Sequence, residues 1–235
     1  MTVFNKKKRK PAKNDDISLI TIGDEKSPIA EQYRSIRTSI KYAMVDYNLK
    51  TLVVTSSGPS EGKSTTSANL AIVFAKSGLK VLLLDADLRK PTMAKTFKVS
   101  NIQGLSTILV DRELPISSVC QPSGVLNLSL MPSGPKPPNP SELLGSKRMS
   151  EVIAEVKEHY DLVIFDMPPA IAVTDAQIVA SQSDATILVV REGVSDKNLL
   201  KRANHLLSMV NANVIGAVYN GVTREKSDNY YYYGE

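Results

Sequence analysis

The hydrophobic pattern of the chain alternates between short apolar runs and longer amphipathic segments. Unbroken apolar runs bounded by turn residues are typical of strands buried on both faces of a sheet, whereas apolar positions three and four residues apart indicate helices. The pattern predicts strands at 51–56, 80–85, 125–131, 160–166, 185–191 and 213–219, and helices at 63–77, 104–110, 147–158, 174–181 and 196–209. This alternation favours an α/β fold with a doubly wound, mainly parallel sheet flanked by helices.

A further helix is expected before the first strand. Ser27 and Pro28 supply an N-cap and a proline at the first helical position, and the helix should continue to about Tyr42. On one side of this helix, charged residues recur at every third position as Glu31, Arg34 and Arg37. That side is either a solvated face with local ion pairs or a contact surface. The apolar stripe expected to pack on the domain consists of Ile29, Tyr33, Ile36 and Ile40.

The two ends of the chain differ from its body. Residues 1–26 hold a basic run and are expected to form a flexible leader, either a solvated tail or a segment attracted to anionic lipid or an acidic partner. Residues 27–222 are expected to form one domain, and residues 223–235 a flexible tail with four consecutive tyrosines. Inside the domain, the proline-rich segment 131–140 should be an ordered loop, because proline interrupts both helices and sheets.

Composition excludes several classes of protein. The net charge of +5 over 235 residues comes largely from the basic run near the start, so the body is not that of a general nucleic-acid binder. The single cysteine, Cys120, rules out internal disulfides, a zinc site built from cysteines and an iron–sulfur cluster, and indicates a reducing compartment. No apolar run approaches the length of a membrane span, so membrane association would need charge or a partner.

A candidate phosphate-binding loop joins the strand 51–56 to the helix 63–77. In this context the backbone N–H groups of the loop and the helix dipole can together bind an anion. Lys63 can reach the β- and γ-phosphates of a nucleotide, and the Ser64 hydroxyl can bind Mg²⁺. The common spacing of such loops has a further glycine where this chain has Ser57. The expected nucleotide-binding residues are Gly58, Pro59, Ser60, Glu61, Gly62, Lys63, Ser64 and Thr65.

Two further strands end in carboxylates. Asp85 and Asp87 lie at the carboxyl end of the strand 80–85, and Asp166 ends the strand 160–166. Open α/β sheets bind ligands beyond the carboxyl ends of their strands, so we expect the three carboxylates beside the loop. Carboxylate oxygens suit Mg²⁺, and one of them can orient or deprotonate an attacking group. The alternative for each aspartate is that it caps a turn or the next helix.

Together these motifs resemble the bacterial tyrosine kinases of the exopolysaccharide and capsule type, from about residue 27 to the end. The resemblance implies protein-tyrosine kinase activity with ATP and Mg²⁺ on a P-loop NTPase scaffold similar to that of partition ATPases. The eukaryotic kinase motifs His-Arg-Asp and Asp-Phe-Gly are absent from the sequence. The residues that carry the resemblance are Glu31, Arg34, Arg37, the loop 61–65, the run 85–91, the segment 137–140, the run 166–169 and the tyrosine tail.

The resemblance also implies a role for individual residues. Lys63 would hold the phosphates, and either Asp85 or Asp87 would activate the acceptor hydroxyl. Asn220, at the end of the last strand, would contact adenine unless it only forms a turn. The implied catalytic residues are Lys63, Asp85, Asp87 and Asp166, the implied metal ligands are Ser64, Asp85, Asp87 and Asp166, and Arg89 and Lys90 are possible contacts to phosphate or acceptor.

Partners are implied in the same way. The family suggests a cytoplasmic chain recruited to the membrane by an integral-membrane adaptor with a cytoplasmic tail. It also suggests a ring-shaped homo-oligomer, an octamer in the family, closed by the face of Glu31, Arg34 and Arg37. Protein substrates and a cognate tyrosine phosphatase are expected, whereas nucleic acid is not required. The expected phosphoacceptors are Tyr230, Tyr231, Tyr232 and Tyr233.

Two other functions compete with a kinase. A partition or division-site ATPase of the same fold would act as a dimeric switch, but such proteins carry an additional lysine near the start of the loop. Here Ser56, Ser57 and Gly58 occupy that region. A non-catalytic adaptor that only binds nucleotide is disfavoured because Lys63 and the three carboxylates are all present.

Overall fold

The computed structural model describes residues 17–47 and 49–222. The expectations for residues 1–16 and for the tail 223–235, including the four tyrosines, lie outside the described residues.

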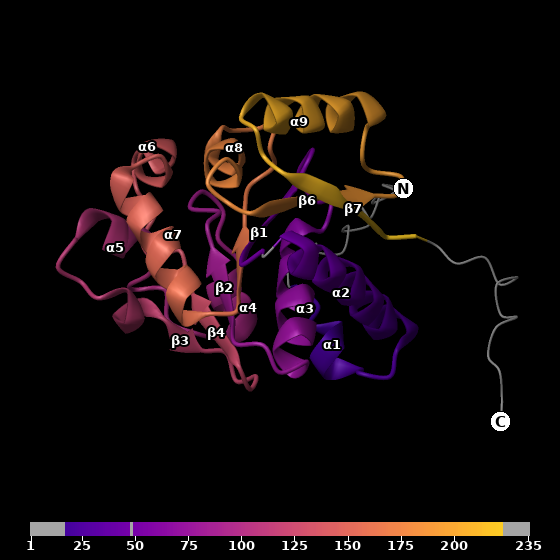
Figure 1. The fold of residues 1–235 in the computed structure, drawn as a ribbon, viewed down its shortest axis with the longest axis horizontal. Helices are drawn as coiled ribbons and strands as arrows, with labels where there is room; N and C mark the ends of the chain where they lie inside the picture. Colours follow the sequence, from indigo (N-terminus) through magenta and orange to yellow (C-terminus); the bar gives the residue numbers. More distant parts are fainter. Residues whose placement is uncertain (1–16, 48, 223–235) are drawn as a thin grey trace, which may run out of the picture.

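A seven-stranded sheet forms the centre of the described chain (Figure 1). Its strand order is β3-β4-β2-β5-β1-β6-β7, and every neighbouring pair is parallel except β3 with β4. Strands β2 to β5 lie on one side of β1, and β6 and β7 lie on its other side. This arrangement confirms the doubly wound, mainly parallel sheet. The strands are β1 Thr51–Ser56, β2 Val81–Asp85, β3 Gln121–Pro122, β4 Leu128–Met131, β5 Leu162–Asp166, β6 Ala185–Arg191 and β7 Val214–Asn220.

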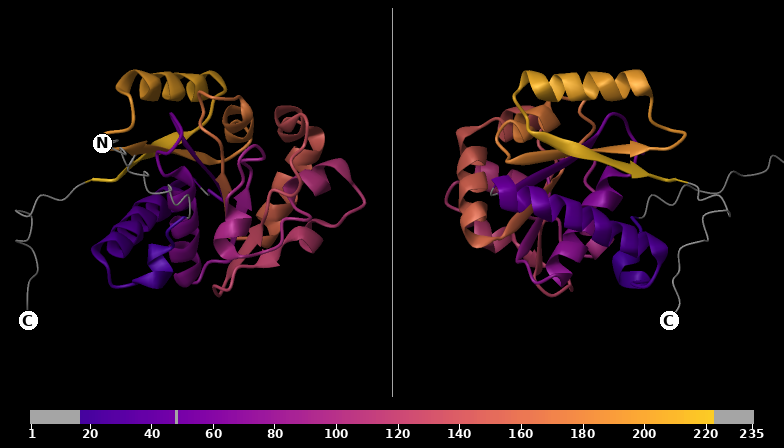
Figure 2. Two further views of the ribbon diagram at one scale, coloured as in Figure 1. Left: turned by 180° about the vertical axis from the view of Figure 1, so that it is seen from behind. Right: turned by 45° about the vertical axis from the view of Figure 1, so that its right-hand side comes forward.

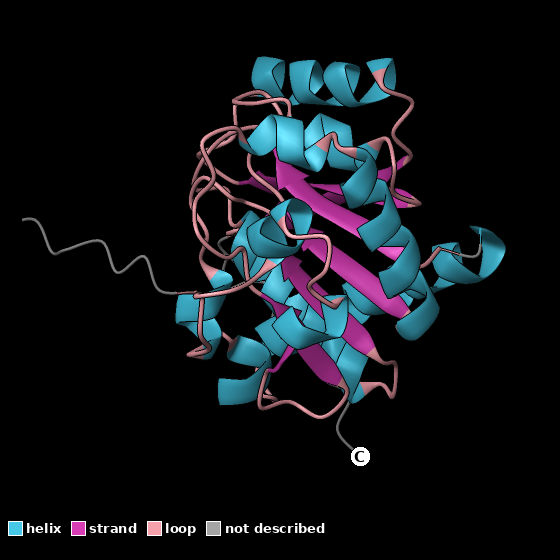
Figure 3. Ribbon diagram, turned by 90° about the vertical axis from the view of Figure 1, so that its left-hand side faces the viewer, coloured by secondary structure: helices cyan, strands magenta, loops and turns pink. Residues whose placement is uncertain are grey.

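Helices cover both faces of the sheet (Figures 1 and 3). One face carries α2 and α3, with α1 beside them, and the other carries α5 to α9. Both views in Figure 2 show α9 lying along β6 and β7. The helices are α1 Ile20–Gly23, α2 Pro28–Tyr47, α3 Lys63–Lys76, α4 Met93–Phe97, α5 Leu105–Val110, α6 Pro140–Leu144, α7 Lys147–His159, α8 Asp175–Ala180 and α9 Lys197–Met209, with a 3-10 turn at Ile116–Val119.

The hydrophobic core consists of two layers, one on each side of the sheet. All residues of β1, β2 and β5 are buried, as expected for parallel strands covered on both faces. The phosphate loop and the predicted carboxylates follow these three strands. The site therefore stands on the most deeply buried part of the sheet.

The expected apolar stripe of α2 is only partly correct. Tyr33 and Ile40 are buried against the core and Ile36 packs beside them, but the side chain of Ile29 is 53% exposed. Ala30, fully buried, takes the place expected for Ile29. At 3.6 residues per turn, position 29 lies within about 40° of positions 33 and 40, so the rotation of the helix does not account for its exposure. Ile29 is the second residue of α2, in the first turn of the helix.

Other differences concern short elements. The strand expected at 125–131 begins only at Leu128. The elements that were not expected are β3, α1, α4, α6 and the 3-10 turn at Ile116–Val119. Gly124 and Asn127 both have positive φ, which gives the turn before β4 its irregular backbone. Elements of five residues or fewer carry too little periodicity for a hydrophobic pattern to identify them.

Part of the segment expected to be a flexible leader contacts the domain. Within residues 17–26, Thr21 is buried, and its backbone N and its Oγ1 donate to Asn69 Oδ1 of α3 at 3.1 and 2.8 Å. Lys76 Nζ donates to the carbonyl of Thr21 and to Glu25. Residues 17–26 are therefore held against the helix that follows the phosphate loop. Across the described ranges, no helix has both the length and the apolar character needed to cross a membrane.

Candidate active site

The phosphate loop lies between β1 and α3, at the carboxyl edge of the sheet. Its backbone alternates sharply, with Ser60 at φ 63° and Gly62 at φ 94°. The positive φ of Gly62 favours glycine, and a Cβ there would lie 2.1 Å from Asn220 Nδ2, so a larger residue would displace that amide. α3 begins immediately afterwards at Lys63, which directs the positive end of its dipole toward the loop.

Loops of this kind commonly have a glycine where this chain has Ser57, and Glu61 holds this part of the loop in place. Its buried carboxylate accepts from the backbone N of Ser57 at 3.0 Å and from Ser57 Oγ at 2.7 Å. Ser56 Oγ donates to the carbonyl of Gly58 at 2.7 Å. The start of the loop is thus closed by side-chain hydrogen bonds. Glu61 was expected among the nucleotide-binding residues, but its carboxylate supports the loop from within.

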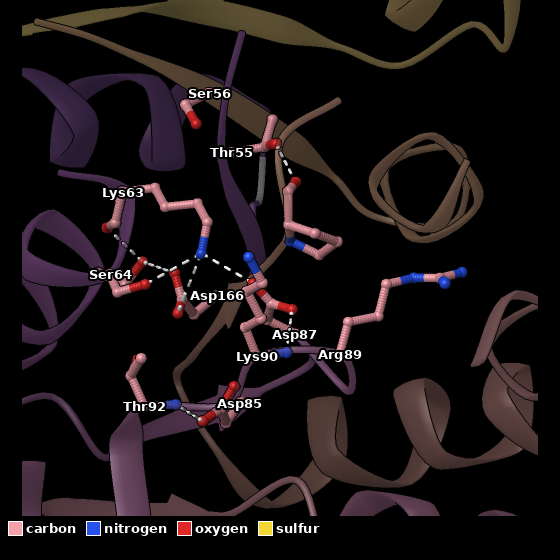
Figure 4. Close-up of polar contacts among 12 residues, drawn as sticks. Thr55, Ser56, Lys63, Ser64, Asp85, Asp87, Arg89, Lys90, Thr92 and Asp166 are labelled. Carbon is pink, nitrogen blue, oxygen red and sulfur yellow. Dashed lines mark hydrogen bonds and ion pairs between the residues drawn. The ribbon is translucent and has the colours of Figure 1, made fainter. Parts of the chain in front are cut away.

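Lys63 lies among the carboxylates (Figure 4). Its Nζ is 3.0 Å from Asp87 Oδ2, 3.1 Å from Ser64 Oγ and 4.0 Å from Asp166 Oδ2. Asp166 Oδ1 also accepts from Ser67 Oγ at 3.0 Å. The structure therefore brings together Lys63, Ser64, Asp87 and Asp166, which the sequence places in three separate segments.

Asp85 is oriented differently from the other two aspartates. It is the register partner of Asp166 on adjacent strands, but its Oδ2 accepts from the backbone N of Thr92 and of Met93, both at 2.9 Å. In Figure 4, Asp85 lies beside Thr92 and away from the Lys63 ammonium. Asp85 thus caps the start of α4, which is the alternative role that the sequence left open.

Burial shifts the ionisation of this cluster. Burial, reinforced by the nearby Asp166 and opposed by the bonds from Met93 and Thr92, raises the pKa of Asp85 to about 7. Burial also raises the pKa of Asp166, against the opposing effect of Lys63. For Lys63, burial lowers the pKa, but the charges of Asp166 and Asp87 outweigh it and the net shift is upward. Lys63 therefore stays a cation.

Two buried oxygens in this cluster make no hydrogen bond within the described protein, namely Asp85 Oδ1 and Asp166 Oδ2. A buried acceptor without a partner is rare and costly, so it suits a ligand that supplies one. In the described part of the chain, no three acidic, histidine or cysteine side chains converge closely enough to hold a metal by themselves. Mg²⁺ in nucleotide sites needs only one or two protein oxygens beside phosphate and water. Ser64 and Asp166 fit that requirement.

The remaining expected contacts have different positions. The Arg89 guanidinium points away from Lys63 (Figure 4) and binds the buried Asp175 at 2.8 and 3.0 Å, so in this arrangement it is not directed at a phosphate. The side chain of Lys90 is exposed, and its backbone N donates to Asp87 Oδ1 at 2.9 Å. Asn220 Nδ2 donates to the carbonyl of Glu61 at 3.2 Å, so this amide contacts the loop.

The face of α2 expected to contact another subunit makes bonds within the chain. Arg34 Nε is 2.7 Å from Glu31 Oε2, and the Arg34 guanidinium also donates to the carbonyl of Glu25. Arg37 Nη1 donates to the carbonyl of Val73 at 3.2 Å. Glu31 is exposed and both arginines are half-buried. These local bonds leave room for a further contact at Glu31.

One residue at the loop was not expected from the sequence. Arg191, the last residue of β6, donates from Nη1 to the carbonyl of Ser60 at 2.9 Å. A strand-terminal arginine was available as a signal, because the carboxyl ends of β1 and β6 had to meet at one edge of the sheet.

The fold and the site together define a P-loop nucleotide-binding protein of the α/β class. Residues 49–213 match the family model described as an AAA domain. The chain is 45% identical over 217 residues to tyrosine-protein kinase YwqD of Bacillus subtilis, covering 92% of this chain and 91% of that one. It is 37% identical to the putative tyrosine-protein kinase CapB of Staphylococcus aureus, covering 94% and 97%. The chain belongs to the bacterial tyrosine kinases, and its enzymatic class is protein-tyrosine kinase.

Solved structures agree with the assignment of this chain to the bacterial tyrosine kinases. The kinase domain of the Escherichia coli tyrosine kinase ETK superposes with a TM-score of 0.85 at 35% identity, covering 94% of this chain and 86% of that one. The chimerical protein CapA2B2 superposes with a TM-score of 0.81 at 36% identity, covering 86% and 88%. The septum site-determining protein MinD of Pyrococcus horikoshii, at 21% identity and a TM-score of 0.62, shares only the fold. This fold implies ATP binding.

Proposed function

We propose that this chain transfers the γ-phosphate of ATP to protein tyrosines, including its own Tyr230 to Tyr233, within a system that makes and exports exopolysaccharide or capsule. The observation that supports this most directly is the convergence of Lys63, Asp87 and Asp166 at the end of the phosphate loop. Phosphoryl transfer passes through a loose transition state, so positioning and charge stabilisation are what a protein must supply.

The residues divide into three roles, which are to hold the phosphates, to hold Mg²⁺ and to act as the base. Lys63 holds the β- and γ-phosphates, and its cation offsets the charge that develops on the transferred group. Ser64 Oγ and Asp166 would hold Mg²⁺, which would neutralise phosphate charge. Of the two candidates for the base, Asp87 is better placed, because it contacts Lys63 whereas Asp85 caps α4. A tyrosine hydroxyl brought to Asp87 can give its proton to Oδ1 or Oδ2 as the phosphoryl group arrives.

The tail supplies the first test of this function. Replacing Tyr230, Tyr231, Tyr232 and Tyr233 by phenylalanine should remove most of the phosphotyrosine that forms on the chain, because a tethered acceptor has a high local concentration. Phosphotyrosine would be measured by mass spectrometry after incubation with ATP and Mg²⁺. The control is Tyr42→Phe, which changes an exposed tyrosine outside the tail. An unchanged phosphotyrosine content in the four-fold variant would contradict the proposed acceptors.

The face of Glu31, Arg34 and Arg37 contacts a neighbouring subunit and closes a ring, in which the tail of one subunit reaches the Lys63 and Asp87 of the next. Such head-to-tail contacts close only when the rotation allows it. Phosphates added to the tail repel one another and the carboxylates of the site, which loosens the ring until a phosphatase resets it.

Replacing Glu31, Arg34 and Arg37 together by alanine should convert the oligomer to monomers on a sizing column. A matched control replaces Lys201 and Arg202, exposed on α9, by alanine. If the triple variant elutes with the oligomeric parent, the face is an ordinary solvated surface with local ion pairs.

Recruitment completes the proposed function. We place the chain in the cytoplasm, brought to the membrane by an integral-membrane adaptor whose cytoplasmic tail orders the nucleotide edge. The similarity to a chimera named for two components, CapA2B2, supports a second component. The ATPase switch is disfavoured because residues 56–58 carry no lysine and MinD resembles this chain in fold alone.

A further inference from the structure

The phosphate loop is held from outside by two side chains at the ends of neighbouring strands. Arg191 ends β6 and Asn220 ends β7, and the two residues are register partners. Arg191 Nη1 donates to the carbonyl of Ser60 at 2.9 Å, and Asn220 Nδ2 donates to the carbonyl of Glu61 at 3.2 Å. Two successive carbonyls of the loop are therefore each bound by a side chain from the far edge of the sheet.

The backbone around these two residues is itself fixed. Ser195 Oγ accepts from the backbone N of Arg191 at 2.7 Å, and the backbone N of Glu192 donates to the carbonyl of Asn220 at 3.0 Å. Gly221 has φ 73°, and a Cβ there would lie 3.3 Å from Arg191 Cγ. Glycine at 221 thus lets the arginine side chain lie across the end of β7 on its way to the loop.

The direction of a carbonyl determines the direction of the next N–H. In a trans peptide the C=O of one residue and the N–H of the following residue point in opposite directions, and the described chain has no cis peptide. Arg191 holds the carbonyl of Ser60 so that it points out of the loop, and the N–H of Glu61 therefore points into the loop. In the same way, the bond from Asn220 to the carbonyl of Glu61 directs the N–H of Gly62 into the loop. Among the described residues, neither N–H donates to another group.

These two N–H groups belong to the concave part of the loop that suits an anion. Successive N–H groups form such a nest when the backbone alternates between right- and left-handed conformations, and Ser60 and Gly62 are both left-handed. Serine disfavours that conformation, so contacts from outside are needed to keep it populated. The amide of Asn220 fills the space beside Gly62. The bond from Asn220 to the carbonyl of Glu61 therefore depends on glycine at position 62.

We propose that Arg191 and Asn220 are positioning residues that orient the N–H donors of Glu61 and Gly62 toward nucleotide phosphates. Together they form a brace that acts through the loop backbone on the phosphate part of the ligand and not on its base. For Asn220, this role differs from the adenine contact expected from the sequence. The proposal rests on the proposed function, in that it assumes a nucleotide whose phosphates bind the loop.

The test measures binding of two ligands that differ in whether they have a base. Arg191→Ala and Asn220→Ala are compared with wild type for the Kd of ADP and of inorganic tripolyphosphate, the latter by competition with a fluorescent ADP analogue. Loss of a donor should raise the Kd of ADP about tenfold in Arg191→Ala and about threefold in Asn220→Ala. The same factors should apply to tripolyphosphate, because the brace acts on the phosphates. Arg191→Lys, which keeps a donor, should recover part of the loss.

Three further measurements separate positioning from other roles. The controls Arg202→Ala and Asn204→Ala change exposed residues of the same types on α9 and should bind both ligands as wild type does. The Tm without nucleotide should be the same in Arg191→Ala and Arg202→Ala, because both arginines are exposed. In phosphotransfer, the KM for ATP should rise by the factor seen in Kd, with a smaller change in kcat.

Each contrary result has one meaning. Unchanged ADP affinity in both variants would overturn the brace, as would a loss limited to ADP, which would instead assign these side chains to the base. A drop in Tm with unchanged Kd would make them structural only. Lys63→Met is measured in parallel. If that variant also binds ADP as wild type does, the proposed nucleotide site fails and the brace with it, whereas weakened binding in Lys63→Met alone refutes only the brace.

Discussion

Replacing Lys63 by methionine should reduce phosphotransfer to tyrosine at least about 100-fold, since removing one preorganised donor from a transferring group costs a factor of this order. Methionine keeps the length and the apolar stem of the side chain but removes the ammonium, which lies 3.0 Å from Asp87 and 4.0 Å from Asp166. The measurement is the initial rate of phosphotyrosine formation at saturating ATP.

A matched control is Lys201→Met, which removes an exposed lysine of α9 and should leave the rate unchanged. The unfolding temperature of both variants should be recorded, because Lys63→Met leaves two buried carboxylates without their cation and lowers stability at neutral pH. A Lys63→Met chain that is folded and still phosphorylates at the wild-type rate would contradict the assignment of the phosphate loop.

The Asp166→Asn variant should lose activity to a similar extent while becoming no less stable. Asparagine keeps an oxygen that can accept from Ser67 Oγ, so the hydrogen bond at 3.0 Å is retained. It removes the negative charge that faces Lys63 and that the proposed role of Asp166 provides for Mg²⁺, which should lower the rate about 100-fold or more. Initial rates and thermal unfolding on the same preparation provide the measurement.

The stability of this variant relative to wild type should depend on pH because the pKa of Asp166 differs between the folded and unfolded chain. Burial raises the pKa of Asp166, so the folded state favours the protonated form. A raised carboxyl pKa contributes stability that is present below the unfolded value of about 3.8 and is lost as the pH rises through the folded value. For Asp85→Asn, the folded value of about 7 places that loss between about pH 4 and pH 7. Both asparagine variants should therefore gain stability relative to wild type as the pH rises, and a loss of stability at pH 8 would show that the charged forms support the fold.

The sheet and the centre of the site were predictable because each depends on a strong local signal. The continuous apolar runs of β1, β2 and β5 could only be buried strands, and parallel strands place their carboxyl ends at one edge. Lys63, Ser64, Asp87 and Asp166 follow from that geometry and from the glycine-bearing loop. The individual bonds among them, such as that of Lys63 Nζ to Asp87 Oδ2, were not predicted.

Other features could not be predicted because they depend on long-range side-chain contacts. Nothing local distinguishes Asp85, which caps α4, from Asp87, which binds Lys63, since both lie at the carboxyl end of the same strand. Arg89 shows the same limit, because the buried Asp175 that binds it lies 86 residues away in the sequence. Ile29 was misplaced because it shares the helical angle of Tyr33 and Ile40, and its exposure depends on how the domain covers the first turn of α2.

The central claim is that the γ-phosphate goes to tyrosine. The most direct measurement follows ATP labelled at its γ-phosphate, incubated with the chain, Mg²⁺ and the cytoplasmic tail of its adaptor, and separates label on phosphotyrosine from label released as inorganic phosphate. A tyrosine kinase places label on phosphotyrosine in the wild type and none in Lys63→Met. Label that appears only as inorganic phosphate, with none on protein, would instead identify an ATPase switch and contradict the kinase assignment.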